Sequence, residues 1–106
     1  MARTAKRLLQ TALSTTAAAV YTAPASTNAQ VTEIYLANTG TTARTVTLYA
    51  NGTATTNSIV TGLIINGSAS SILQDLKIVI PTGTILAAKQ DSGTDIIMTA
   101  FGVEEV

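Results

Sequence analysis

Two short segments, residues 31–38 and 44–49, place large aliphatic side chains at every second position. Successive side chains of a strand point to opposite faces of a sheet, so this period of two predicts β-strands. In the first segment Ile34 and Leu36 share one side, which we expect to face a core. Tyr35 falls on the opposite, outward side.

The residues between these segments predict a hairpin. Residues 38–41 read Asn-Thr-Gly-Thr, in which Asn tolerates left-handed backbone geometry and Gly needs no Cβ clearance. The return strand then points Val46 and Leu48 inward. On this hairpin Tyr35 and Tyr49 are expected to be cross-strand neighbours on the outward face, paired in sheet packing or serving as an interface anchor.

The rest of the chain repeats short apolar segments at turn spacings of about 8–12 residues. Gly62 is expected to form a β-bulge, and Pro81 must end a strand because it cannot donate to a ladder. The last segment has apolar residues on both sides, including Met98 and Phe101, so both of its faces should be at least partly covered. The predicted fold is all-β, a single β-sandwich of about eight short antiparallel strands, immunoglobulin-like or jelly-roll in topology. The further strands are expected at residues 58–66, 70–74, 76–80, 84–89 and 95–103.

The first residues combine basic and apolar side chains, and we divide the chain into an N-terminal arm or first strand (1–16) and a β-sandwich domain (17–106). They imitate a signal peptide, but polar residues interrupt the apolar run of about 7–15 residues that such a peptide needs. A strand is favoured over residues 8–14, and the basic side chains are expected in a solvated arm or a surface contact. The candidate interface residues are Arg3, Lys6, Arg7, Leu8, Leu9, Tyr35 and Tyr49.

Charge is sparse in this sequence. Only 11% of the residues are charged and the formal net charge is zero, which suits a surface that becomes covered. The few basic residues are dispersed, which argues against a nucleic-acid partner, since neutralising several phosphates requires a basic stripe. No segment approaches the about 20 apolar residues of a membrane-spanning helix. We expect neither a nucleic-acid nor a membrane partner.

The chain has no cysteine and no histidine, which excludes disulfides, structural zinc sites and catalysis by Cys or His. Asp91 and Asp95 flank one turn, where turn formation and solvation explain them better than calcium binding or catalysis. Aromatic residues are too few for the stacking platforms of a typical sugar-binding sandwich. The sequence therefore predicts no enzyme, no cofactor and no catalytic or metal site.

Several motifs, in this order, resemble those of small β-sandwich virion proteins of tailed bacteriophages. The likeness covers most of the chain. The matching segments are Tyr21-Thr22-Ala23-Pro24-Ala25, Ala37-Asn38-Thr39, Thr45-Val46-Thr47, Ile80-Pro81-Thr82-Gly83-Thr84-Ile85-Leu86 and Gly102-Val103-Glu104.

The resemblance implies a non-enzymatic structural protein located in the virion. Its expected role is a head decoration or neck (collar) component that docks in many copies on a larger capsid, portal-neck or tail protein. A homo-oligomer is expected, because symmetry repeats one modest interface until it holds. The alternatives are a carbohydrate-binding β-sandwich module and a tail-fibre or baseplate accessory that contacts the host surface.

Overall fold

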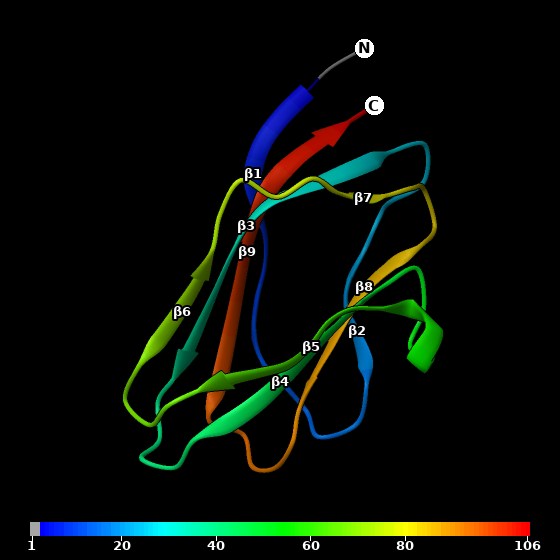
Figure 1. Cartoon of the computed structure of the whole chain (residues 1–106). Helices are drawn as coiled ribbons and strands as arrows, with labels where there is room; N and C mark the ends of the chain where they lie inside the picture. The colour runs from blue at the N-terminus through cyan, green and yellow to red at the C-terminus, as the bar shows by residue number, and fades with distance from the viewer. Residues whose placement is uncertain (1–2) are drawn as a thin grey trace.

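The computed structural model describes residues 3–106, which form two antiparallel β-sheets packed face to face (Figure 1). The predicted all-β sandwich is confirmed. Among the described residues the only helix is the short 3₁₀ turn η1 (Thr55–Asn57), and no helix is long and apolar enough to cross a membrane. The strands are β1 (Arg3–Ala12), β2 (Ala18–Thr22), β3 (Asn28–Asn38), β4 (Arg44–Ala50), β5 (Ser58–Ile65), β6 (Ser70–Leu73), β7 (Ile78–Ile80), β8 (Ile85–Gln90) and β9 (Ile96–Glu105).

The pairing of these strands distinguishes between the two predicted topologies. Sheet A has the order β1-β9-β3-β6, with β7 also paired to β3, and sheet B has the order β2-β8-β4-β5. The strand pairs are therefore nested in the sequence: β1 pairs with β9, β2 with β8, β3 with β6 and β7, and β4 with β5. Together they form one long two-stranded ribbon that is folded over itself. Successive parts of this ribbon alternate between the sheets, which is the jelly-roll arrangement. β6 and β7 both run along β3 and together form one interrupted strand.

The predicted hairpin between residues 31–38 and 44–49 is wrong, although both strands exist. β3 belongs to sheet A and β4 to sheet B, so the chain between them crosses from one sheet to the other. The buried Asn38 side chain fixes this crossing by donating to the carbonyl oxygens of Thr42 (2.8 Å) and Ile65 (3.0 Å). The turn residues reverse the chain as expected, but they connect two sheets instead of two neighbouring strands.

The hairpin that follows this crossing joins β4 to β5. Asn51 begins its turn in the left-handed region, with a φ of 67°, as expected of an Asn-Gly turn. Val46 pairs with Leu63 and Leu48 with Val60, so β5 holds an extra residue between these pairs. Gly62, with a φ of 66°, lies in this irregularity, which confirms the predicted bulge.

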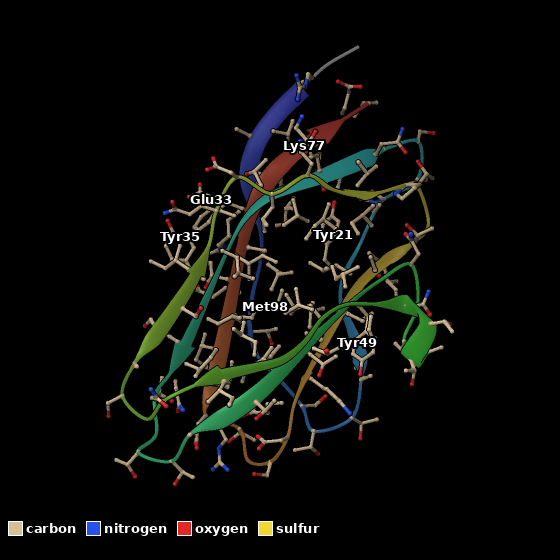
Figure 2. The ribbon with its side chains drawn as sticks, viewed as in Figure 1. Tyr21, Glu33, Tyr35, Tyr49, Lys77 and Met98 are labelled. Atoms are coloured by element: carbon tan, nitrogen blue, oxygen red, sulfur yellow. The ribbon has the colours of Figure 1, made fainter. Side chains whose placement is uncertain are left out.

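The core lies between the two sheets and contains the aliphatic residues that the period of two points inward. Ile34, Leu36, Val46 and Leu48 are all completely buried, as predicted. β9 adds Met98, which Figure 2 shows in the space between the sheets. The period of two therefore identified the buried side of both strands even though it did not identify their partners.

The N-terminal segment is a strand of the sandwich, not a separate arm. β1 pairs with β9 along its length, from Arg3 opposite Glu105 to Ala12 opposite Ile97. Leu9 is buried in the core cluster. Of the two interpretations of this segment, arm or first strand, the structure shows the strand. It starts earlier than the predicted 8–14. The sandwich therefore includes residues before position 17, where the predicted domain began. Residues 1 and 2 lie outside the described part of the chain.

We expect Met98→Ala to lower the free energy of unfolding by about 2–5 kcal/mol, because it removes a fully buried side chain and leaves a cavity. Ile97→Ala is the matched control, since the neighbouring side chain points to the other, partly exposed face of β9. Urea unfolding of both variants measures the difference. Equal losses would contradict the assignment of the core side of β9.

Candidate functional site

The outer face of sheet A carries an exposed apolar surface, which we call the sheet A patch and define as Tyr35, Ile72 and Phe101. These side chains keep 37%, 48% and 37% of their surface exposed, respectively. The rings of Tyr35 and Phe101 meet edge to face, with centroids 5.6 Å apart and planes at 86°. Large apolar side chains grouped in this way on a sheet face are characteristic of surfaces that become covered by a partner.

Strand register brings the patch together from three strands. Tyr35 on β3 lies opposite Ile72 on β6 and, on the other side, opposite Thr99 on β9. Phe101 lies opposite Glu33, so it is the diagonal neighbour of Tyr35 on the same face. The Tyr35 hydroxyl donates a long hydrogen bond of 3.4 Å to a carboxylate oxygen of Glu33, so a carboxylate lies beside the two rings.

A groove of about 520 Å³ adjoins the patch where β6 and β7 are interrupted. The chain leaves the edge of β3 here, with Asp75 in the left-handed region (φ 57°) and the Leu76 N–H donating to the Thr32 carbonyl oxygen at 3.0 Å. The groove offers amide, hydroxyl, carboxylate and ammonium groups for hydrogen bonding. Its lining residues are Gln30, Thr32, Glu33, Gln74, Asp75, Leu76 and Lys77.

Across residues 3–106, no group of three or more acidic, His or Cys side chains is arranged to hold a metal ion. The two aspartates of the 91–95 turn accept hydrogen bonds from residues of β4. Asp95 accepts from Arg44 Nη2 at 2.8 Å, and Asp91 Oδ1 accepts from the Thr45 N–H at 3.1 Å. Both carboxylates thus fix the turn between β8 and β9.

The basic residues predicted as interface candidates are engaged within the chain. Arg3 pairs with Glu105 at 3.2 Å and Lys6 with Glu104 at 3.1 Å, both across the β1/β9 ladder. Arg7 donates to the Gln10 side chain at 3.2 Å. The two carboxylates offset the charges of Arg3 and Lys6, which makes this strand a weak electrostatic attachment site.

The two apolar interface candidates of β1, Leu8 and Leu9, pack in or against the core. Leu8 is partly buried at the bulge of β1 and packs against the core cluster, and Leu9 belongs to that cluster. Neither side chain is therefore available as the anchor of an interface.

The two predicted tyrosines lie on different sheets, so their expected cross-strand pairing is wrong. Figure 2 shows Tyr35 on the outer side of sheet A and Tyr49 at the opposite side of the molecule, on sheet B. Tyr49 lies opposite Ala87 on β8 and is only 5% exposed, despite pointing outward as predicted. Of the two, Tyr35 alone remains a candidate contact residue.

Sequence reasoning did not select Phe101 and Ile72 as site residues. The apolar residues on both sides of the last strand were the signal for Phe101, because one of those sides had to face outward. Ile72 had no comparable signal, since it lies in a short serine-flanked segment whose outer side depends on its pairing with β3.

A polar cluster, Lys6, Tyr21 and Glu104, connects the two sheets. The Tyr21 hydroxyl on β2 donates a hydrogen bond to Glu104 on β9, and Lys6 pairs with the other carboxylate oxygen. Burial, and then the neighbouring carboxylate, raise the pKa of the Tyr21 hydroxyl. The hydrogen bond from Tyr21 lowers the pKa of Glu104, opposed by partial burial and assisted by Lys6. The cluster is a structural tie near one end of the sandwich.

Comparison of the chain with protein-family models, with curated proteins and with solved structures gives no match.

Acidification should destabilise the fold through Glu104. Its pKa is lowered by folding, so the unfolded chain binds the proton more readily, and the stabilisation present above the usual pKa of 4.5 is lost as the pH falls through the folded value. We expect Glu104→Gln to lower the free energy of unfolding at neutral pH by about 1 kcal/mol and to weaken its dependence on pH below that range. Urea unfolding at a series of pH values measures both effects.

Glu105→Gln is the matched control, because the neighbouring carboxylate is more exposed and pairs across the surface with Arg3. Exposed pairs contribute about 0–1 kcal/mol, so this variant should stay close to the unmodified chain. Identical pH profiles for the unmodified chain and Glu104→Gln would refute the role given to the cluster.

Proposed function

We propose that the chain is a non-enzymatic structural protein of a tailed-phage virion, a head decoration or neck component that docks in many copies on a larger particle protein. The observation that carries the proposal is the sheet A patch. Its two rings and one aliphatic side chain lie together on a regular sheet face, in a chain whose other large residues mostly fill the core. Covering such a patch removes apolar area from water and fits the enrichment of aromatic residues at interfaces.

The topology is compatible with this role, since jelly rolls form capsid domains as well as lectin domains. This support rests on analogy, because one fold hosts many functions. The geometry of the chain also changes the expected mode of attachment. Residues 3–12 are committed to sheet A, and their basic side chains already have partners, so we assign docking to the face of sheet A and not to an N-terminal arm.

The second candidate function is carbohydrate binding, and the groove beside the patch favours it. Gln30, Gln74 and Lys77 supply the kind of hydrogen-bonding groups that fix sugar hydroxyls. Tyr35 borders the groove through Glu33, but its ring is already in edge contact with Phe101. The groove therefore has polar donors without an open aromatic platform, and we rank this function second.

Ile72→Lys should weaken docking strongly, because it places a charge in the surface that becomes buried. Purified variant chain is added to virions that lack the gene product, and bound chain is quantified after density-gradient recovery. We expect occupancy to fall by about tenfold or more. Ile59→Lys is the matched control on sheet B, with 43% of Ile59 exposed against 48% of Ile72, and should bind like the unmodified chain.

Two results would overturn this assignment. In the first, the chain is absent from purified virions and remains in the soluble fraction, which removes the structural role itself. Alternatively, both lysine variants dock equally well, which leaves the structural role but moves the contact away from the sheet A patch.

We expect the free chain to show no measurable affinity for host cell-wall glycans in a glycan-array or calorimetric titration. Gln74→Ala, in the groove, and Ile59→Lys, on the other sheet, serve as paired variants. Binding that Gln74→Ala abolishes and Ile59→Lys preserves would place the carbohydrate-binding function ahead of the structural one.

A further inference from the structure

One edge of sheet B is formed by β5, an eight-residue strand without a charged side chain. Ile64, near its end, is 65% exposed, more than any other large apolar side chain among the described residues. An exposed apolar edge strand is a template for pairing with another chain. Apart from its bulge at Gly62, β5 has none of the usual protective devices.

The backbone of Ile64 is directed toward this free edge. Ile64 lies opposite Thr45 on β4. The Thr45 N–H donates to Asp91 Oδ1 at 3.1 Å and its carbonyl accepts from the Asp91 N–H at 3.0 Å, so both groups face away from β5. In an antiparallel ladder, the residue opposite such a position also turns its N–H and C=O away from the shared side. Ile64 therefore presents a donor and an acceptor at the free edge.

The other edges of the two sheets are less suited to self-pairing. β1 carries Arg3, Lys6 and Arg7, and an antiparallel pair of two copies would bring these like charges close together. It is also bulged at Leu8. The β6/β7 edge is interrupted by residues 74–77, and β2 has only five residues. Only β5 combines length, neutrality and an exposed aliphatic side chain.

We propose that β5 pairs antiparallel with β5 of a second copy of this chain, with a two-fold axis at Ile64. Ile64 of each copy then exchanges both backbone hydrogen bonds with Ile64 of the other, and the two side chains lie together on one face. The two four-stranded sheets B become one continuous sheet. Such an interface is isologous, and a neutral strand suits it because no charge meets its own copy.

The role of this pairing in assembly rests on the proposed multi-copy function. The pairing itself needs no other protein and can form between two isolated chains. The bulge at Gly62 limits the regular pairing to a few residues, so the contact is small. A small contact of this kind is populated at high chain concentration, such as that on the surface of a particle, where avidity adds to it.

Sedimentation velocity from micromolar to millimolar chain tests the pairing. We expect a concentration-dependent dimer in the unmodified chain and association weakened by about tenfold or more in Ile64→Lys, because the lysines of the two copies meet at the axis. Ile72→Lys, on sheet A, is the matched control and should dimerise normally. Ile64→Pro is a second variant, since it removes the free-edge donor without removing a bond to β4.

Amide hydrogen exchange supplies a readout that the sheet A patch does not affect. The Ile64 amide should become more protected as chain concentration rises, and the Leu63 amide, which faces β4, should not change. A chain that stays monomeric at all concentrations would overturn the proposal. So would a dimer that Ile72→Lys disrupts and Ile64→Lys leaves intact. Either result leaves the virion docking test unaffected, so the two proposals fail separately.

Discussion

The arrangement of sheet A depends on β9, which is paired along both edges, to β1 on one side and β3 on the other. Its geometry is set at Gly102, where an added Cβ would collide with the Gln30 carbonyl oxygen, opposite the bulge in β3. With the strands this close, Phe101 points outward into the sheet A patch and Glu104 reaches inward to Tyr21 on the other sheet. One strand therefore positions both the exposed aromatic surface and the polar tie between the sheets.

The sequence predicted local features of the fold better than its pairing. The inward direction of Ile34, Leu36, Val46 and Leu48 follows from the alternation of side chains along one strand, which requires no knowledge of neighbours. The choice between immunoglobulin-like and jelly-roll topology depends on which strands pair over long sequence separations. Asn38 illustrates the limit, because its turn chemistry was evident, whereas its bonds to Thr42 and Ile65 exist only once β3 and β4 lie in different sheets.

The candidate site was predicted in part for the same reason. Tyr35 was identified as an outward aromatic residue, and its neighbours were not, because they come from β6 and β9 through register. Tyr49 has the same residue type and the same outward direction, yet it is covered on sheet B beside Ala87. Outward direction along a strand therefore does not by itself determine exposure.

The two proposed contact surfaces lie on different sheets, and this separation has a consequence for assembly. A copy that docks through the sheet A patch keeps the β5 edge of sheet B available for a neighbouring copy. The docking contact fixes the orientation of each copy, which lowers the entropic cost of pairing the next β5 edge. Docking and self-pairing should therefore reinforce each other on a particle, because each contact raises the effective concentration for the other.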